Sequence, residues 1–269
     1  MTSKRVLITL STLLVIVVIG VFVWTLTYDC RHDTRTVLPP STETEPGASP
    51  APAGPSSVMP PGEPPTVDLF GNRLEVPSES AGVAIPQTTA ARPDPVGADY
   101  LMAAPVGVRW QRIWGGAAAP VSSSDGPVRI ADGIATGFSR TPQGAALAAA
   151  DALARALAAP ERTWQQVVRD RFYGGGQPLI DRFARSRAST PDTARYVTVP
   201  DGVRVRPGYS SELAVVEFAL ADRDGYAVST WPMVWVDGDW RVRVDDIETL
   251  WGPTKRVLTL TGFGAWEGM

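Results

Sequence analysis

The chain has 269 residues, of which 44 % are hydrophobic and 20 % are charged, and its net charge is −3. This length and apolar content suffice to bury one good core, and the near-neutral charge argues against a surface that coats nucleic acid. The presence of a single cysteine and a single histidine excludes an intrachain disulfide and the ligand spacing of a zinc site.

The first predicted element is a membrane-spanning helix over residues 6–28. The stretch Val6–Leu26 runs for 21 residues without a charge, and as a helix it would span roughly 30 Å, the thickness of a bilayer's hydrocarbon core. A cleaved signal peptide, the alternative, has a shorter apolar core and small residues at its cleavage site. Because Lys4 and Arg5 precede the helix, the positive-inside rule places residues 1–5 in the cytoplasm and the rest of the chain outside the cell membrane.

A disordered, proline-rich linker is predicted over residues 29–65. Ten of the 27 residues from Pro39 to Pro65 are proline, and such a segment cannot bury enough apolar surface to offset its ordering entropy. Cys30 is either an incidental thiol or a cross-link between two copies just outside the membrane. Residues 66–100 are more apolar, and we expect an extended arm that packs onto the following domain or onto another protein.

The folded domain is expected over residues 101–252, followed by a strand or tail at residues 253–269. Trp110 and Trp114 are four residues apart, a spacing that suits one face of a helix. Residues 128–139 alternate weakly around an Asp-Gly pair, which predicts a small hairpin.

Three helices are predicted next. Thr141 suits an N-cap, with Pro142 at the first helical position, and this helix ends before Pro160. The second helix is expected over residues 161–173 and the third over residues 178–188. Their apolar stripes, at spacings of three and four residues, are Leu147, Ala150, Leu153 and Leu157; Trp164, Val167, Val168 and Phe172; and Leu179, Ile180, Phe183 and Ala184.

After Pro191 the apolar pattern changes to a period of two, which predicts strands. The candidate strands are residues 203–208, 212–222, 225–236 and 239–251. Three helices followed by four strands indicate an α+β fold, in which the helices pack on the concave side of a bent antiparallel sheet.

The last two strands are predicted to form a hairpin with a defined register. Asp237-Gly238 suits a type I′ turn, so that Trp235 faces Trp240 and Met233 faces Val242. An aromatic cross-strand pair with an apolar column behind it stabilises a hairpin and fixes its register. One side of the hairpin is therefore expected to be core: Trp231, Met233, Trp235, Trp240, Val242 and Val244.

A local excess of arginine marks the helical region. Between Glu161 and Arg206 there are nine arginines and five acidic residues. This pattern indicates either a basic face that docks an acidic partner, anionic lipid, wall polymer or passing DNA, or an ordinary solvated helix surface. The net charge of the chain gives no support to a DNA contact. The candidate docking residues are Arg169, Arg171, Arg182, Arg185 and Arg187.

The terminal hairpin, "VWVDGDWRVRVDDI", resembles the last two strands of the cone-shaped fold shared by nuclear transport factor 2 and ketosteroid isomerase. The resemblance covers roughly residues 141–250 and implies the fold more than an activity. An anchor, a spacer and an external domain of this fold together resemble the inner-membrane assembly-factor subunit of type IV secretion systems. Over about residues 66–252, stretches such as "RWQRIWGGAAAPVSSSDGP", "GFSRTPQGAALAA" and "RFYGGGQPLIDRFARSRASTPD" resemble an uncharacterised membrane-protein family of actinobacterial conjugative elements.

An enzyme of this superfamily would need a base in its cone, commonly an aspartate or a His–Asp pair. The single histidine, His32, lies beside the membrane segment, and Asp151, Asp170, Asp181 and Asp245 are each better explained as helix-surface or strand-end carboxylates. We therefore expect no catalytic residue, no cofactor and no metal. A pocket with a buried carboxylate of raised pKa would favour an enzyme instead.

The resemblance implies a non-enzymatic, membrane-anchored scaffold or assembly subunit of a conjugation or type IV secretion-like apparatus. Its expected partners are further copies of itself, other subunits of the membrane complex, and the lipid bilayer through Val6–Leu26. The alternative is a cell-envelope accessory or ligand-binding module, similar to the membrane-anchored partners of actinobacterial lipid importers, which would need a deep apolar cavity. An anchored isomerase or hydrolase is the third interpretation.

Overall fold

The computed structural model describes residues 63–88, 92–248, 250 and 255–267. The predicted membrane helix, almost all of the linker, Cys30 and His32 lie outside these ranges. Residues Pro61–Met269 form one compact unit, so the structure has no division at the expected boundary near residue 101. Each helix within the described ranges falls short of the length and apolar content needed to cross a bilayer.

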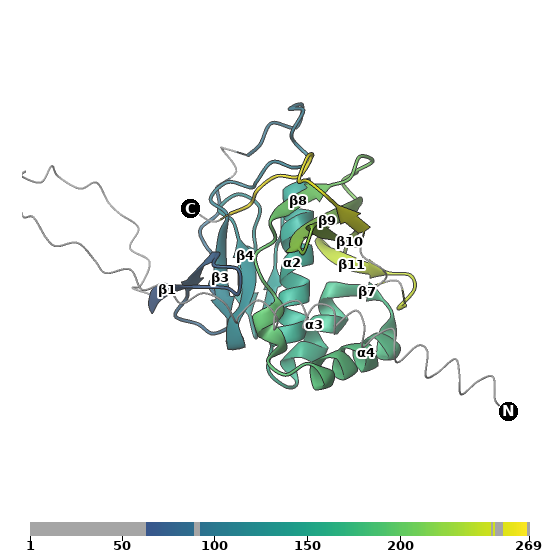
Figure 1. The fold of residues 1–269 in the computed structure, drawn as a ribbon. Helices are drawn as coiled ribbons and strands as arrows, with labels where there is room; N and C mark the ends of the chain where they lie inside the picture. The colour runs from purple at the N-terminus through teal and green to yellow at the C-terminus, as the bar shows by residue number, and fades with distance from the viewer. Residues whose placement is uncertain (1–62, 89–91, 249, 251–254, 268–269) are drawn as a thin grey trace, which may run out of the picture. The chain divides into compact units, whose positions relative to one another are not determined.

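The fold is α+β, as expected, with three α-helices in the described residues and two larger sheets (Figure 1). The first sheet has the order β1-β2-β3-β4, and β2 runs parallel to β3. The segment expected to be an extended arm thus supplies β2 and the end of β1. The first three residues of β1, Glu63–Pro65, correct the predicted disordered linker, which was expected to extend to residue 65. Its elements are β1 Glu63–Val67, β2 Arg73–Val76, β3 Arg109–Ile113, the 3₁₀ turn η1 Trp114–Gly116 and β4 Ala117–Val121.

The expected helix around Trp110 and Trp114 is wrong. Trp110 lies in β3, which pairs with β4 along its whole length, and Trp114 begins η1. The four-residue spacing of the two tryptophans suggested one face of a helix. Instead, the backbone of β3 is hydrogen-bonded to the apolar strand β4. The small hairpin is confirmed, because β5 (Arg129–Ala131) and β6 (Ile134–Thr136) are antiparallel about Asp132-Gly133, both with positive φ.

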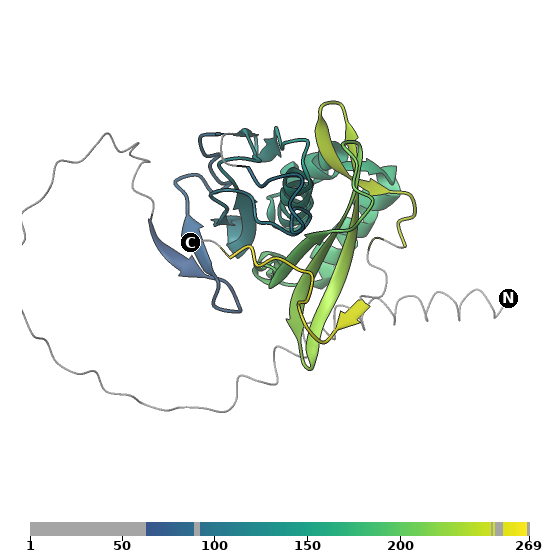
Figure 2. The same cartoon turned by 90° about the horizontal axis from the view of Figure 1, so that it is seen from above.

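The first predicted helix is α2 (Pro142–Ala158), and its N-cap is confirmed because Oγ1 of Thr141 accepts a hydrogen bond from the amide of Gly144 at 3.0 Å. This helix contacts both β4 and β11 and lies between the two sheets (Figure 2). It is therefore buried around most of its circumference. Of the predicted stripe, Leu147 is fully buried and Ala150 is partly buried. Leu153 and Leu157 are only partly buried, whereas most of its alanines are inaccessible and allow both sheets to approach.

The other two helices are α3 (Thr163–Arg171) and α4 (Gly176–Ser189). The second helix was predicted to continue through Tyr173, but Phe172–Gly174 form strand β7, which pairs in parallel with β11. The third helix buries three of its four predicted apolar residues, and Ala184 is exposed. A second 3₁₀ turn, η2 (Thr193–Tyr196), follows.

The second sheet has the order β7-β11-β10-β9-β8, with β12 paired to β10. It is antiparallel except for the β7–β11 pair, so the expected all-antiparallel sheet is corrected to a mixed one. In the C-terminal region, Gly264 bridges to Val203 and the buried Trp266 donates to the carbonyl of Met102 at 3.1 Å. The strands are β8 Gly202–Val205, β9 Leu213–Asp222, β10 Gly225–Val236, β11 Asp239–Val244 and β12 Lys255–Val257.

The terminal hairpin has the predicted register, with Trp235 opposite Trp240 and Met233 opposite Val242. Trp235 was expected to be buried in the core, and this expectation is wrong. It is only partly buried, packs edge-to-face on Trp240 with ring centroids 5.4 Å apart, and lies beneath the guanidinium of Arg140. The other five residues of the predicted set are buried: Trp231, Met233, Trp240, Val242 and Val244.

Candidate docking site

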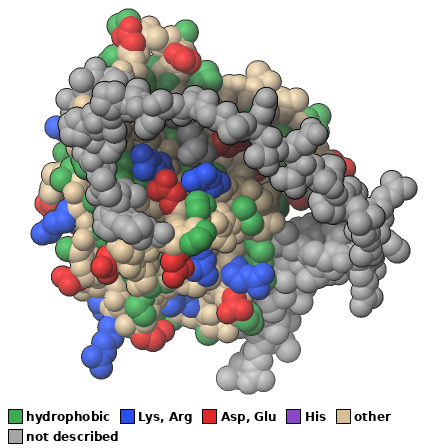
Figure 3. Space-filling model, turned by 90° about the vertical axis from the view of Figure 1, so that its left-hand side faces the viewer, with side chains coloured by type: hydrophobic (Ala, Val, Ile, Leu, Met, Phe, Trp, Pro, Cys, Tyr) green, Lys and Arg blue, Asp and Glu red, His purple; other side chains and the backbone are tan. Residues whose placement is uncertain are grey.

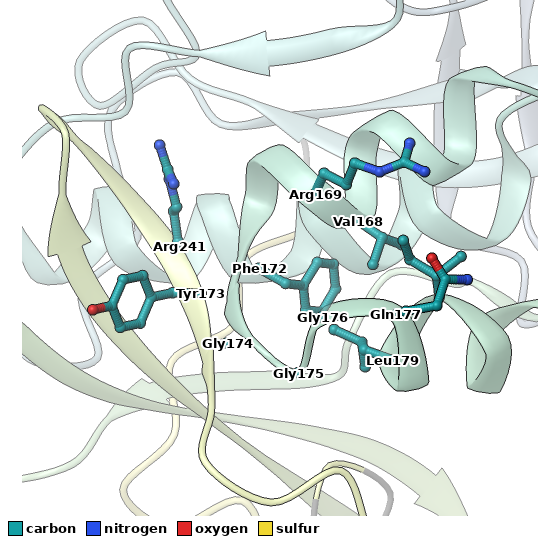
Figure 4. Close-up of a pocket in the computed structure, with 11 residues that line it drawn as sticks. Val168, Arg169, Phe172, Tyr173, Gly174, Gly175, Gly176, Gln177, Leu179 and Arg241 are labelled. Carbon is teal, nitrogen blue, oxygen red and sulfur yellow. The ribbon is translucent and has the colours of Figure 1, made fainter.

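A pocket of about 470 Å³ opens between α3, β7 and α4, and we call it the α3–α4 pocket. Its apolar residues come from both helices and from the strand between them (Figure 4). Because these side chains also belong to the main hydrophobic core, the floor of the pocket is continuous with that core and is held rigidly. The floor residues are Val168, Phe172, Leu179 and Ile180.

Three consecutive glycines form the wall between β7 and α4. Gly174, Gly175 and Gly176 have φ angles of 92°, 76° and 51°, a left-handed region that other residues enter only with strain. A Cβ on Gly175 would lie 2.8 Å from the Cβ of Leu179, so the close approach of this loop to α4 also requires glycine. All three glycines line the pocket, so this wall consists of backbone atoms.

The polar lining of the α3–α4 pocket includes two arginines and no carboxylate. Arg241 and Tyr173 lie on one side of Phe172, and Arg169 and Gln177 lie on the other (Figure 4). Arg241 is paired with Asp237 at 2.9 Å, but that aspartate is largely exposed and such pairs contribute only about 0–1 kcal/mol. The pocket lining therefore combines a buried apolar floor with two arginines, whose guanidinium groups point away from Phe172 (Figure 4).

The five arginines of the predicted docking face do not form one surface. Arg171 is 2 % exposed and donates from Nη1 to Oδ2 of Asp239 and from Nη2 to the carbonyl of Trp240, both at 2.8 Å. Its assignment to a docking face is wrong, because its charge is used to neutralise a carboxylate in the core.

Arg187 also has a structural role. Its guanidinium donates to the carbonyls of Ala156, Leu157 and Ala159 at the end of α2 and lies 5.2 Å from the ring centroid of Trp164. These carbonyls have no partner within the helix, and a cation at a helix C-terminus is favourable. Burial lowers the pKa of Arg187, and we assign it to helix capping.

The remaining three predicted docking residues are accessible to different degrees. Arg182 forms an ion pair with Glu248 at 3.2 Å. Arg169 and Arg185 are exposed and have no ion-pair partner among the described residues. Of the five, Arg169 alone lines the α3–α4 pocket.

The four aspartates considered as a lone base lie outside the lining of this pocket. Asp151 was expected on a helix surface, but it is fully buried, and its Oδ1 accepts from Nε of Arg155 at 2.7 Å. Burial raises the pKa of Asp151, and the positive charges of Arg155 and Arg171 oppose that rise. It is thus a buried carboxylate of raised pKa, but it belongs to an ion pair inside the core. Asp170, Asp181 and Asp245 each accept a hydrogen bond from a neighbouring side chain.

A second surface, over the four-stranded sheet, carries interspersed acidic, basic and apolar side chains (Figure 3). The β1–β2 turn exposes Leu69 and Phe70, by 39 % and 41 %. The turn is rigid because Oδ1 of Asp68 accepts from the amides of Phe70 and Asn72, both at 2.9 Å. This surface has mixed charge, so it favours no class of ligand.

The described residues contain no group of three or more histidine, cysteine, aspartate or glutamate side chains placed to hold a metal ion. The two arginines and the absence of carboxylates fit an anionic ligand in the α3–α4 pocket. The sequence showed only three consecutive glycines, at positions 174–176, between two predicted helices, and such a pattern does not specify a pocket. The sequence analysis did not identify Arg241 as a pocket residue. Its strand, β11, pairs with β7, and the paired residues Val242 and Phe172 are 70 positions apart in the sequence.

The model of a family described as a domain of unknown function, DUF8175, matches residues 75–265 of this chain. A comparison with curated proteins found no match, and neither did a comparison with solved structures. The matched range contains all three helices and both sheets, apart from β1 and the first two residues of β2. The function is therefore argued from the geometry of the site.

Proposed function

This chain belongs to the DUF8175 family, and we propose that it is a non-enzymatic, membrane-anchored scaffold subunit of a conjugation or type IV secretion-like DNA-transfer apparatus. In this proposal its external domain acts through contacts with other proteins and with further copies of itself. The anchor is Val6–Leu26, with the N-terminus in the cytoplasm and the domain outside the cell membrane.

The observation that carries the proposal is the composition of the α3–α4 pocket. It joins apolar and aromatic side chains to two arginines, a composition enriched in protein interfaces. The lining has no carboxylate and no histidine to act as a general base. Such a pocket can bind a ligand, but its own side chains offer no acid–base chemistry near neutral pH.

The topology supports the proposal that the α+β domain has a cone-shaped fold similar to that of nuclear transport factor 2. Two helices precede β7, which pairs with the last long strand, β11, and the third helix precedes the antiparallel strands β8 to β11. All three helices contribute to one core with the six-stranded sheet. The three helices and the antiparallel strands β8 to β11 agree with the predicted element order, whereas β7, between the second and third helices, was not predicted.

A ligand-binding module of the lipid-importer type would need a deep apolar cavity between helices and sheet. The core shared by α2 and the six-stranded sheet includes Phe138, Trp231 and Trp240, all at most 4 % exposed. These large side chains occupy space that a buried ligand would need. The filled core therefore favours the scaffold over the ligand-binding module.

The test is chemical cross-linking in living cells, followed by detergent extraction of the full-length protein and mass spectrometry of what co-purifies. We expect recovery of further copies of the chain together with subunits of a secretion-type ATPase or channel. A tagged, unrelated single-pass protein expressed at the same level is the control. A co-purifying lipid or small molecule without any specific protein would contradict the proposal and favour the ligand-binding module.

A further inference from the structure

We infer that the face of the six-stranded sheet that points away from α2 binds the same face of a second copy of this chain. Five apolar side chains, which we call the outer strip, form the centre of this contact. This inference rests on the proposed function, because it names the surface through which the scaffold contacts further copies of itself. The outer strip consists of Leu213, Val215, Pro232, Val234 and Val236.

The strand register places the outer strip on one face of the sheet. Pro232 lies opposite Val215, and Val234 lies opposite Leu213. Side chains two residues apart along a strand share a face, and the residues between them point to the other face. One of these intervening residues, Met233, is buried in the core that the sheet shares with α2. The outer strip therefore lies on the side of the sheet that is turned away from α2 (Figure 2).

The outer strip is accessible. Leu213 is 47 % exposed, Pro232 is exposed, and the three valines are only partly buried. None of the five side chains belongs to a hydrophobic cluster in the part of the chain that the structure describes. A sheet face that borders water normally carries polar residues at alternate positions. Apolar residues at neighbouring positions of two paired strands therefore indicate a face that a partner covers.

The same face is already covered where the C-terminal segment of the chain crosses it. Gly202 lies opposite Ala219 in the β8–β9 pair, and a Cβ on Gly202 would lie 2.9 Å from Phe263 and 3.0 Å from Leu260. Beside this contact, Ala219 and Val228 are 0 % and 2 % exposed. One half of this face is thus buried by the chain itself, and the apolar surface continues from there into the accessible outer strip.

The charges around the outer strip favour a second copy over an anionic ligand. Four arginines border the strip, and each is paired with a carboxylate nearby. A phosphate, a lipid headgroup or an acidic peptide would have to displace one of these pairs. The pairs are Arg204–Glu217, Arg206–Glu217, Arg241–Asp237 and Arg243–Asp245, at 2.6, 4.0, 2.9 and 2.8 Å.

Symmetry explains why the partner is the same surface. These four arginines and three acidic residues leave the rim within one charge of neutrality, so two identical faces repel each other little. In a two-fold contact the same patch is used on both copies, and each copy supplies an apolar strip with a balanced rim. Two sheets packed face to face bury the apolar side chains between them.

The experiment places single cysteines on the outer face of the full-length protein in its native membrane, after Cys30→Ser has removed the only natural thiol. The positions are Thr230 and Pro232, which are exposed on this face. A short bismaleimide then links thiols that lie close together. We expect a covalent dimer from at least one position, because residues near a two-fold axis lie opposite themselves. Val128→Cys, at a site that is 62 % exposed in another part of the fold, should give at least five-fold less dimer.

A charge placed in the outer strip should break the contact. Val234→Glu, added to the cysteine variant with the higher yield, should lower the dimer yield at least five-fold, because the contact would bury an unpaired carboxylate. The matched control is Val128→Glu, the same change at an exposed valine outside the strip, and it should leave the yield unchanged. Leu213→Glu is the second disrupting variant, since this side chain is 47 % exposed in the single copy. Thermal unfolding of each variant confirms that the domain is folded.

Three results would overturn the inference: dimer yields at Thr230 and Pro232 no higher than at Val128, cross-links from the outer face to a different protein, or an equal yield in Val234→Glu and Val128→Glu. The same membranes are extracted and tested for co-purifying subunits of a transfer apparatus. If these subunits are recovered without a dimer through the outer face, the proposed function survives and this inference alone fails. If the dimer forms and the subunits are absent, the contact between copies is established and the proposed function alone fails.

Discussion

Arg171 and Asp239 form a buried ion pair, with 2.8 Å between Nη1 and Oδ2, that joins the end of α3 to the first residue of β11. The same carboxylate accepts hydrogen bonds from the amides of Gly137 and Phe138, just after the small hairpin β5–β6. One aspartate thus connects three elements that are separated by up to 102 residues in sequence. This contact sets the position of α3, and hence one wall of the α3–α4 pocket.

Replacement of Arg171 by methionine should lower the free energy of unfolding by about 3–5 kcal/mol, because Asp239 would be left buried without its countercharge. Chemical unfolding followed by tryptophan fluorescence measures this change. Arg243→Met is the matched control, since Arg243 pairs with Asp245 at the same distance of 2.8 Å but both side chains are exposed. The control should cost less than about 1 kcal/mol, and equal losses in the two variants would contradict the assigned role.

Replacement of Gly174 by alanine should destabilise the domain and distort the pocket wall. Gly174 has a φ of 92°, and an added Cβ would collide with the carbonyl oxygen of Val244 in β11. Gly208 is the control, because its φ is 96° and an added Cβ would meet no atom within 4 Å.

Both alanine variants incur the cost of the left-handed conformation, about 1–2 kcal/mol. The collision at Gly174 should add at least about 2 kcal/mol to that cost. The difference between their melting temperatures measures the collision alone, and identical values would mean that β7 can move away from β11 without loss.

Removal of the Thr141 hydroxyl should weaken the start of α2. Oγ1 of Thr141 accepts from the amide of Gly144 at 3.0 Å and donates to Oδ1 of the buried Asp125 at 2.5 Å. We expect Thr141→Ala to lose about 1–2 kcal/mol of stability and Thr141→Ser, which keeps the hydroxyl, to lose less than about 0.5 kcal/mol. Equal stability of the two variants in denaturant titrations would show that the hydroxyl is dispensable.

Tyr209 should titrate later than an ordinary tyrosine. Burial raises the pKa of Tyr209 to about 12, and the neighbouring Tyr100 adds to this effect. Because the folded-state pKa exceeds the unfolded value of 10.0, the contribution of this group to stability is complete below pH 10 and is lost as the pH rises toward 12.

An ultraviolet titration of wild type against Tyr209→Phe measures this pKa, since the variant lacks one late-titrating phenol. The stability of the wild type should also fall more steeply than that of the variant between pH 10 and 12. If the stability of the wild type and of Tyr209→Phe fell equally between pH 10 and 12, the raised pKa of Tyr209 would be contradicted.

Part of the candidate site could be predicted from the sequence. The arginine excess and the apolar residues of the two helices were visible, and Phe172, Leu179 and Ile180 were expected to be buried, as they are. The sequence could not show which arginines are exposed and which are buried, because Arg169 and Arg171 are two residues apart and have the same side chain. One lines the pocket and the other neutralises Asp239, a residue that the chain brings close only by folding.

The sequence by itself determined the features whose causes lie within a few residues. These are the register of the terminal hairpin from Asp237-Gly238, the hairpin β5–β6, and the start of α2 at Thr141. Turn geometry and capping depend on local dihedral angles and short hydrogen bonds, so a short pattern specifies them.

Only the tertiary structure decided the features that depend on pairing between distant segments. The alanine-rich helix α2 became a two-sided core element because a sheet packs on each side of it. Residues Phe172–Gly174 became a strand because β11 offers its free edge, although their apolar spacing continues that of the helix before them. A local sequence pattern indicates which residues prefer burial. The strand or helix that buries them depends on how the whole domain packs.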